Sequence, residues 1–456
     1  MARLVRFRVL EGIAVVTLDA PPVNALSGPL RAGLWEVLTR IDANDDIKAA
    51  VLMASGRMFS AGADIREFGA PERQPSLPQL CDRIEACTKP VVAAIHGQAL
   101  GGGAEIALAA HFRLADAEAR IGLPEVALGL IPGAGGTQRL TRLIGAKRAL
   151  QMIISTNSID STSAHRIGLI DGLVQGDLGS GAIAFAKRLV ERGQKPRRTS
   201  ENRSQFKDAR AHQSAIAEAR TALRDNPLHA PLRAVDCVEA AAVLPFQAAL
   251  AFEADAFARC LDHPQSVALR HVFMAERKID NALIERDGTA FRPVDPMGKS
   301  IVQRLRKAMR AAADHLVENG ASEAQVDGAM VAYGFRKGPF GSKDNSTAND
   351  TIARQLIAAL VAEGGACVEE NAVQRPSDID VLAVHGLGFP RRMGGPLRAV
   401  QTTGLIGLRT SMREWAENSD IWAVPMMLDD AIKDARGFDA LGEDHANHDA
   451  HKAENG

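Results

Sequence analysis

The sequence has no excess of charge of either sign. Its 54 lysine and arginine residues are balanced by 55 aspartate and glutamate residues, which leaves a formal net charge of -1 over 456 residues. Nucleic acids and anionic membrane surfaces are recruited by a basic field, so we expect neither as a partner. We interpret the local basic run KPRR at residues 195–198 as a solvated linker.

Cysteine motifs and long apolar runs are also missing. The five cysteines are scattered and form no C-x-x-C pair, so we expect reduced thiols in a cytoplasmic protein. No uninterrupted apolar run approaches the roughly 18 residues that a membrane-spanning helix needs, and the first residues lack the apolar core of a signal peptide. The remaining composition, 46% apolar and 24% charged, is ordinary for a globular chain, and the length predicts two or more domains.

The N-terminal part of the chain alternates between strand-like and helix-like segments. A turn at Glu11-Gly12 separates two β-rich runs within residues 5–18, and Ser27 can cap a helix that runs to about Ile41. Further expected segments are a buried strand at 49–53, a helix at 77–87 and a strand at 90–95. This recurrence predicts a layered α/β domain over residues 1–190.

The rest of the chain is rich in helix-like patterns. We expect a helical connecting region over residues 191–295, ending in a linker near 287–296, then an all-α domain over 296–440 and a polar, disordered tail over 441–456. Phe246, Leu250, Phe257 and Leu261 recur at helical spacing and predict one apolar helix face.

The expected all-α domain contains a degenerate internal repeat. Its first copy has Val326-Asp327, Gly334-Phe335 and Gly338-Pro339, and its second copy has Ile379-Asp380, Gly388-Phe389 and Gly395-Pro396. Each copy is a helix that runs into a Gly/Pro turn. We therefore expect two similar helical units that pack face to face.

Two glycine-rich turns, each near a glutamate, carry the candidate chemistry. The run LGGGAE at residues 100–105 opens a helix, and Pro124-Glu125 precede IPGAGGT at residues 131–137. Consecutive glycines at a helix start leave backbone N–H groups bare and let a ligand approach the main chain. Bare N–H groups can stabilise an oxyanion, and two carboxylates can move protons. The pattern indicates a reactive centre for thioesters.

Three segments together resemble the crotonase superfamily. They are FSAGADI at residues 59–65, GQALGGGAE at residues 97–105, and the stretch 123–140, which begins LPE and ends GTQRL. The likeness extends over about residues 5–280 and implies an α/β domain of the ββα spiral type. It also implies that the backbone N–H groups of Ala63 and Gly102 bind the thioester oxygen and stabilise an enolate.

The resemblance gives Glu105 and Glu125 the acid–base work of hydration. By family precedent, Glu125 transfers the proton and Glu105 positions the water that attacks C3. Two nearby carboxylates repel each other, so one of them is expected to have a raised pKa. The alternative is that Glu105 is a charge favoured at a helix start and Glu125 is a solvated strand end. Relatives that hold only the equivalent of Glu125 tend to be isomerases, so the pair favours a hydratase, with Δ3,Δ2-enoyl-CoA isomerisation as an accompanying activity.

Four further residues lie within or beside these segments. Arg66 occupies the position where relatives often carry a lysine near the CoA phosphates, and a solvated arginine is the alternative. Ala61 and Ile65 lie in the segment whose backbone holds the adenine in relatives, so both are expected CoA contacts. His96 precedes the glycine loop, and we interpret it as a hydrogen-bonded structural histidine rather than a base.

The sequence after residue 230 resembles multifunctional β-oxidation enzymes, which join a crotonase domain to a 3-hydroxyacyl-CoA dehydrogenase. Residues 244–278 resemble their connecting helix, and residues 375–396 resemble the helical C-terminal repeats of the dehydrogenase. Those enzymes place a nucleotide-binding domain with a G-x-G-x-x-G turn between the two parts. Here only a short linker separates Lys278 from Met297, so neither NAD binding nor dehydrogenase activity is expected.

These features predict an enoyl-CoA hydratase that converts 2-enoyl-CoA into 3-hydroxyacyl-CoA in fatty-acid β-oxidation, with CoA as part of the substrate and no metal or redox cofactor. One rival hypothesis is another crotonase reaction, a hydrolase or an isomerase. A second is a non-catalytic remnant that binds acyl-CoA or scaffolds a β-oxidation complex, and a third is a dehydrogenase completed by another chain. The helical domain is expected to cover apolar surface, to mediate homo-oligomerisation or contact with a partner enzyme, or to hold a separate binding site.

Overall fold

A computed structural model describes residues 4–68, 71, 73–288, 290–344, 348–434 and 436–441. The expected polar tail, apart from Leu441, lies outside these described residues. Internal contacts divide the chain into two units, Met1–Asp262 (unit 1) and His263–Gly456 (unit 2). The residues of the expected connecting region 191–295 are therefore shared between the two units.

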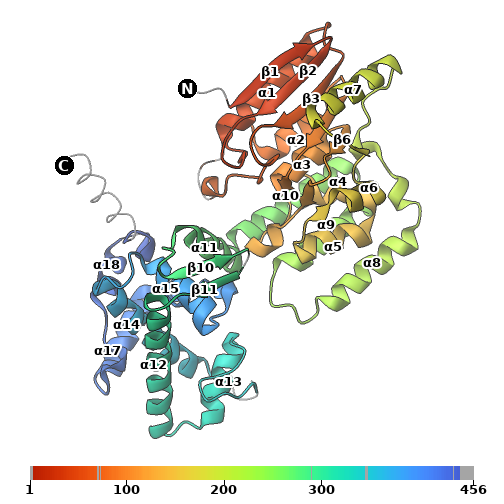
Figure 1. Cartoon of the computed structure of the whole chain (residues 1–456). Coiled ribbons are helices and arrows are strands. Elements are labelled where there is room, and N and C mark those ends of the chain that lie inside the picture. Colours follow the sequence, from red (N-terminus) through yellow and green to blue (C-terminus); the bar gives the residue numbers. More distant parts are fainter. Residues whose placement is uncertain are drawn as a thin grey trace, which may run out of the picture. The chain divides into compact units, whose positions relative to one another are not determined.

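A six-stranded sheet organises unit 1, in the order β1-β2-β3-β4-β6-β9. Figure 1 labels β1, β2, β3 and β6 of this sheet. Its strands are β1 (Val5–Leu10), β2 (Ile13–Leu18), β3 (Ala49–Ala54), β4 (Val91–Ile95), β6 (Phe112–Ala115) and β9 (Gly172–Leu173). β1 and β2 form the antiparallel hairpin predicted around Glu11 and Gly12, and the other neighbours are parallel. β2, β3 and β4 are runs of mostly buried apolar residues, because helices cover both of their faces.

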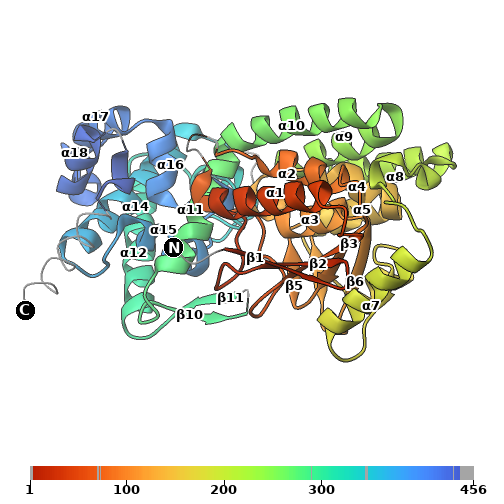
Figure 2. The ribbon, with the colours of Figure 1, turned by 90° about the horizontal axis from the view of Figure 1, so that it is seen from above.

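Figure 2 shows α7 on one side of this sheet and α1, α2 and α3 on the other. These helices are α1 (Gly28–Ala43), α2 (Leu77–Glu85), α3 (Gly102–Ala109) and α7 (Leu178–Glu191). Ala49 and Val51 of β3 pack with α7, whereas Ala50 and Leu52 belong to the core on the opposite face. The period of two along a strand separates the two sets. The layered α/β arrangement predicted for the N-terminal region is confirmed.

A second, three-stranded sheet carries the turns singled out in the sequence. It consists of β5 (Gln98–Leu100), β7 (Arg120–Gly122) and β8 (Ile159–Asp160). β5 leads into α3, and β7 leads into the 3-10 turn Glu125–Leu128 and then α4 (Gly136–Ile144). Because β5 and β7 run parallel, both glutamate-bearing turns leave the same edge of this sheet.

Further helices extend unit 1 beyond residue 190. They are α5 (Ala146–Ser155), α6 (Ser161–Arg166), α8 (Ala209–Ala222), α9 (Ala230–Val243) and α10 (Phe246–Asp262). α9 contacts α4, α5, α8 and α10, and its buried Val235, Cys237 and Val238 belong to the same core as the sheet residues Val16 and Leu52. The core is therefore continuous from the sheet to these helices.

Unit 2 consists mainly of helices around α12 (Met297–Glu318) and α14 (Asp350–Glu369). Its other helices are α11 (Pro264–Lys278), α13 (Glu323–Tyr333), α15 (Pro376–Leu382), α16 (Pro396–Thr403), α17 (Leu405–Ala416) and α18 (Met426–Lys433). By length and composition α14 could cross a membrane, but 61% of its most apolar window is buried inside the structure. Its apolar character is therefore that of a core helix.

The linker expected near residues 287–296 is corrected by the structure. Two antiparallel strands, β10 (Ile284–Asp287) and β11 (Ala290–Pro293), form a hairpin at this place. Ile284 is buried in the core of unit 2, and Phe291 packs against that core. The sequence did not predict this hairpin because its strands are short and mostly polar.

The internal repeat of unit 2 has a common physical basis in its two copies. Asp327 accepts hydrogen bonds from the N–H groups of Phe340 and Ser342, and Asp380 accepts them from those of Leu397 and Arg398. In each copy a glycine lets the following turn approach the aspartate: a Cβ on Gly338 or Gly395 would lie within 2.3 Å of an atom of Asp327 or Asp380, respectively. The Phe335 and Phe389 rings meet edge to face, with centroids 5.3 Å apart. The two copies are therefore built alike, and their phenylalanine rings are in contact; that the two helical units pack face to face stays a prediction.

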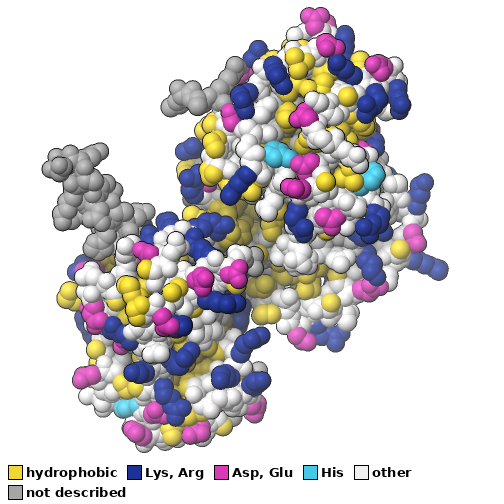
Figure 3. Space-filling view, viewed as in Figure 1, with side chains coloured by type: hydrophobic (Ala, Val, Ile, Leu, Met, Phe, Trp, Pro, Cys, Tyr) yellow, Lys and Arg dark blue, Asp and Glu magenta, His cyan; other side chains and the backbone are white. Residues whose placement is uncertain are grey.

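Charged side chains of both signs are interspersed over the face drawn in Figure 3. Several form local pairs, such as Arg220 with Asp236 and Glu239 in unit 1. At such places opposite charges pair locally, in keeping with the near-zero net charge of the sequence.

Candidate active site

The segment around Ser60 lies beside the strand that precedes the glycine turn. Ser60 forms a parallel bridge with Ala99. The Ser60 N–H donates to the Gln98 carbonyl at 3.1 Å, and the Leu100 N–H donates to the Ser60 carbonyl at 3.0 Å. These bonds hold the two expected oxyanion segments side by side, although they are far apart in the sequence.

Glycines let these two segments approach each other closely. A Cβ on Gly62, where φ is +98°, would lie 2.7 Å from the Leu100 carbonyl oxygen and 3.1 Å from the Gly102 nitrogen. A Cβ on Gly102 would lie 3.1 Å from the Ala63 nitrogen. The N–H groups of Ala63 and Gly102 are thus neighbours, and within the described part of the chain neither donates to a protein acceptor. Two free main-chain donors side by side are what a developing oxyanion requires.

Glu105 lies in the first turn of α3 and is held in a fixed orientation. Its side chain is buried, and its Oε1 accepts hydrogen bonds from the N–H groups of Ala134 at 2.7 Å and Gly136 at 2.9 Å. Burial raises the pKa of Glu105 to about 7, against the lowering effect of these two N–H groups and of the Arg139 charge. A proton can therefore be exchanged at this carboxylate near neutral pH.

Glu125 approaches the same place from the 3-10 turn that follows β7. Its Oε1 would lie 3.2 Å from a Cβ on Gly101, the residue that precedes α3, and its buried Oε2 has no hydrogen-bond partner among the described residues. Burial raises the pKa of Glu125 well above its ordinary value, and the negative charges of Glu105 and Glu253 raise it further. The two predicted glutamates are thus brought together, and the alternative of a solvated strand end does not fit Glu125.

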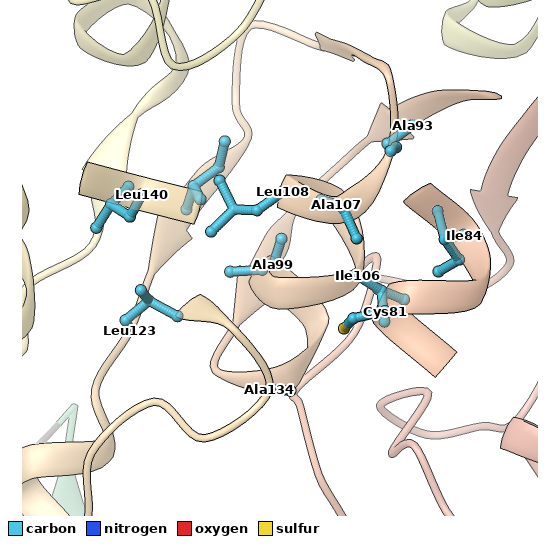
Figure 4. Packing of buried hydrophobic residues seen from close by; sticks show 14 of the residues in the cluster. Cys81, Ile84, Ala93, Ala99, Ile106, Ala107, Leu108, Leu123, Ala134 and Leu140 are labelled. Carbon is cyan, nitrogen blue, oxygen red and sulfur yellow. The ribbon is translucent and has the colours of Figure 1, made fainter. Parts of the chain in front are cut away.

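Apolar side chains pack around α3. Figure 4 shows Ile106, Ala107 and Leu108 of α3 among side chains from neighbouring elements, including Leu123 and Leu140. The buried core on this side also contains Cys81 and Ile84 of α2. A low-dielectric surrounding strengthens both the hydrogen bonds to an oxyanion and the coupling between the two carboxylates.

A buried arginine ties the α4 turn to α2. The Arg139 guanidinium is 1% exposed and donates to Glu85 at 2.9 Å, to Asp82 at 2.8 Å and to the Ala134 carbonyl at 3.0 Å. Paired charges of this kind are stable in the interior because each donor has an acceptor. Arg139 therefore holds Ala134, whose N–H in turn holds Glu105.

A third buried glutamate, Glu253 on α10, was not predicted from the sequence. It accepts hydrogen bonds from the N–H groups of Gly135 at 2.6 Å and Thr137 at 2.9 Å, and also from the Thr137 hydroxyl. The signal was present, because Glu253 lies between Leu250 and Phe257 on the predicted apolar face of the helix. A carboxylate at a core-facing position is seldom found without a partner or a function.

A family model described as "Enoyl-CoA hydratase/isomerase" matches residues 8–230, which include every segment of the site except α10. Residues 8–230 belong to the enoyl-CoA hydratase/isomerase family. The α/β fold of unit 1 is accordingly crotonase-like, as expected, and it is followed by a helix-rich portion.

Curated relatives of this hydratase/isomerase region are longer proteins. The chain is 38% identical over 269 residues to a peroxisomal bifunctional enzyme of Danio rerio, and 40% identical over 274 residues to one of Homo sapiens. Each match covers 59% of this chain but only 37% and 38% of the respective relative, so the chain spans less than half of their length. Among solved structures, an enoyl-CoA hydratase from Bacillus anthracis is 26% identical, with 60% of this chain and 96% of that chain covered and a TM-score of 0.40.

The expected CoA contacts lie at or near the surface of unit 1. Ala61 is exposed, and Ile65 is half-buried at the start of the 3-10 turn Ile65–Glu67. The exposed Arg66 guanidinium pairs with Asp64 at 2.7 Å and 2.9 Å, so it is both solvated and available at the surface. The CoA-binding role of these residues stays a prediction.

His96 has the kind of environment expected of a structural histidine. Its Nε2 lies 3.0 Å from the Gly56 carbonyl oxygen. This hydrogen bond fixes the ring beside the loop that follows β3, which fits the structural interpretation made from the sequence.

Proposed function

We propose that the hydratase/isomerase region adds water to a 2-enoyl-CoA and forms a 3-hydroxyacyl-CoA. The observation that carries this proposal is the electrostatically coupled pair of the buried Glu105 and the half-buried Glu125, whose Oε2 is buried, beside the free N–H groups of Ala63 and Gly102. An acyl-CoA substrate agrees with the family to which the region belongs.

Each part of this arrangement has a task in hydration. The thioester oxygen accepts hydrogen bonds from Ala63 and Gly102 N–H, so the negative charge that builds up during attack at C3 is stabilised. The water oxygen bonds to C3 while its proton passes to a carboxylate, and a proton is delivered to C2. The C2–C3 double bond becomes a single bond, and the thioester carbonyl is restored.

The hydrogen bonds support a division of labour between the glutamates. Glu105 Oε1 is held by two backbone N–H groups, so this carboxylate has the fixed geometry needed to keep a water in line with C3. Glu125 Oε2 is buried without a partner among the described residues and its pKa is raised, so it can hold a proton and deliver it to C2. The same enolate would serve Δ3,Δ2-enoyl-CoA isomerisation, which we propose as an accompanying activity.

The test follows the loss of the conjugated enoyl-thioester absorbance with the purified full chain and with Glu105→Gln and Glu125→Gln. Each substitution is expected to lower kcat by about 10²-fold or more, the typical contribution of a positioned acid or base. Glu276→Gln is the matched control, because Glu276 is also a buried glutamate but lies in unit 2 with His385 and Arg391 as partners.

The outcomes separate the rival functions. A wild-type chain that binds acyl-CoA but leaves the absorbance unchanged would support a non-catalytic binding or scaffold role. Products other than the 3-hydroxyacyl-CoA would support a different crotonase reaction. Full activity in either active-site variant would show that the role assigned to that glutamate is wrong.

For unit 2 we propose a correspondence to the helical C-terminal repeats of 3-hydroxyacyl-CoA dehydrogenases, without the NAD-binding domain. The two Asp-Gly-Phe-Gly-Pro copies support this correspondence, and only residues 279–296 lie between α11 and α12. A strand, a phosphate loop and a helix do not fit in that length together with the β10–β11 hairpin. We therefore expect no saturable fluorescence change when NADH is titrated into the chain, and a saturable change would contradict the proposal.

A further inference from the structure

Four consecutive N–H groups, from Ala134 just before α4 to Thr137 in its first turn, are divided between two carboxylates. Ala134 and Gly136 donate to Glu105, whereas Gly135 and Thr137 donate to Glu253. The first N–H groups of a helix have no partner inside the helix, and they carry its positive dipole end. Here two buried glutamates, one on α3 and one on α10, satisfy alternate members of the set.

One face of α10 is shaped to the α4 turn. A Cβ on Gly133 would lie 2.5 Å from the Phe257 ring, and a Cβ on Gly135 would lie 3.1 Å from the Leu250 side chain. The Arg139 guanidinium lies over the Phe246 ring, 5.2 Å from its centroid. Residues of α10 both before and after Glu253 therefore pack against the turn that Glu253 binds.

A chain of hydrogen bonds fixes the orientation of Glu253. The Gln138 side-chain amide donates to the Cys237 carbonyl and to the Thr137 hydroxyl, each at 2.8 Å, and the Thr137 hydroxyl is bonded to Glu253 Oε2. Both oxygens of Glu253 are thus occupied by groups of the turn. None of these bonds leads toward the free N–H groups of Ala63 and Gly102, so Glu253 is tied to the turn and not to the reacting centre.

The charged surroundings of Glu253 come from several elements. Glu105 of α3, Glu125 and the Cys237 thiol of α9 interact with it electrostatically, and Arg139 of α4 acts on Glu105. Burial and then the Glu105 charge raise the pKa of Glu253 to about 8. These three glutamates therefore form one coupled system, in which a change in the charge of one shifts the pKa of the others.

We propose that Glu253 is a positioning residue of the hydration site, which holds the first turn of α4 so that Ala134 and Gly136 present their N–H groups to Glu105. The inference rests on the proposed function for its effect on catalysis. It places part of the machinery on α10, outside the residues that the family model matches.

The physical reason is competition for the turn. Without the Glu253 carboxylate, the buried N–H groups of Gly135 and Thr137 lose their acceptor oxygens. The turn can then rotate so that these N–H groups donate to the Glu105 carboxylate instead. A displacement of about 1 Å in a positioned group can reduce the rate about 10²-fold. Substrate binding through the Ala63 and Gly102 N–H groups would be left intact.

The experiment compares wild type, Glu253→Gln and the control Glu276→Gln as full chains. It measures kcat, KM, the pH profile of kcat, and backbone hydrogen exchange of residues 132–140. Glu253→Gln is expected to lower kcat by about tenfold to 10²-fold with KM within about twofold, and to speed exchange in the turn. It also removes a negative charge that raises the pKa of Glu125, so the descending limb of the profile, where Glu125 loses the proton that it delivers to C2, moves to lower pH. A role in packing alone would change the melting temperature and leave that limb in place.

The readouts keep the two proposals apart. A kcat within about twofold of wild type, with an unmoved pH limb, overturns the positioning role. If wild type does not hydrate enoyl-CoA, the proposed function fails and hydrogen exchange decides. Faster hydrogen exchange of residues 132–140 in Glu253→Gln, but not in the control Glu276→Gln, then supports the positioning role. Unchanged exchange in Glu253→Gln overturns it.

Discussion

The oxyanion site can be tested by distorting its backbone, because no side-chain substitution deletes an N–H group. Gly62→Ala is the sharpest perturbation. Its new Cβ would lie 2.7 Å from the Leu100 carbonyl oxygen and 3.1 Å from the Gly102 nitrogen. Both contacts are to backbone, so the two segments must move apart to relieve them, and the N–H groups of Ala63 and Gly102 move with them.

The expected magnitude has two parts. Alanine at a φ of +98° costs about 1–2 kcal/mol of stability, whatever the space around it. Displacing one oxyanion donor costs about 2.7–4 kcal/mol of transition-state stabilisation, which corresponds to roughly 10²–10³ in kcat. The first part lowers the melting temperature, and only the second lowers the activity of the folded protein.

Gly176→Ala is the matched control for this experiment. Gly176 also has a positive φ, +82°, but a Cβ there meets no atom within 4 Å. The assay follows the loss of the enoyl-thioester absorbance at a temperature where circular dichroism shows both variants folded. Gly62→Ala is expected to lose at least about 10²-fold in kcat, while Gly176→Ala stays within about twofold of wild type. If folded Gly62→Ala keeps more than about a tenth of the wild-type kcat, the Ala63 and Gly102 N–H groups do not form the oxyanion hole.

Three further predictions concern stability. Unit 1 should lose stability as pH rises from about 4.5 to about 8, because burial raises the pKa values of Glu105 and Glu253 to about 7 and about 8. These side chains therefore hold protons that the unfolded chain releases. Calorimetry of Glu253→Gln should show a shallower loss of stability with pH than wild type, and an equal slope would contradict the raised pKa of Glu253. Unit 2 should lose stability as pH falls from about 4.5 to about 2. The reason is that the burial of Glu276 is outweighed by hydrogen bonds from Arg391 and His385, which lower its pKa to about 2. Glu276→Gln should remove this acid sensitivity, and an unchanged loss of stability at low pH in calorimetry would contradict the lowered pKa. Gly395→Ala should lower the melting temperature of unit 2 more than Gly404→Ala does. Both glycines have positive φ, but only a Cβ on Gly395 would meet Asp380, at 2.3 Å, and this overpacking costs about 1–3 kcal/mol of stability. Equal melting temperatures would show that the Asp380 turn is not tightly packed.

Local sequence signals predicted the features that depend on neighbouring residues. The Glu11-Gly12 turn, the strands β3 and β4, and the glycine-rich entry to α3 all have distinctive short patterns. The repeat around Asp327 and Asp380 was also visible, because the same residue types recur at similar spacing.

Features built from distant contacts were not predicted. The extension of unit 1 to Asp262 depends on the packing of α9 against α4 and α5, which has no local pattern. The Arg139 pairs with Asp82 and Glu85 join residues more than 50 positions apart. The role of Glu253 needed the knowledge that α10 lies against the α4 turn, so the sequence showed an acidic residue on an apolar face without its reason.

The position of Glu253 determines where this chain can be divided. A cut at residue 230, where the family match ends, would remove α10 and leave the Gly135 and Thr137 amides without their acceptor. It would also take the Phe257 ring away from Gly133 and the Phe246 ring away from Arg139. Shortened, fused or swapped versions of the protein should therefore keep everything through Asp262 as one piece.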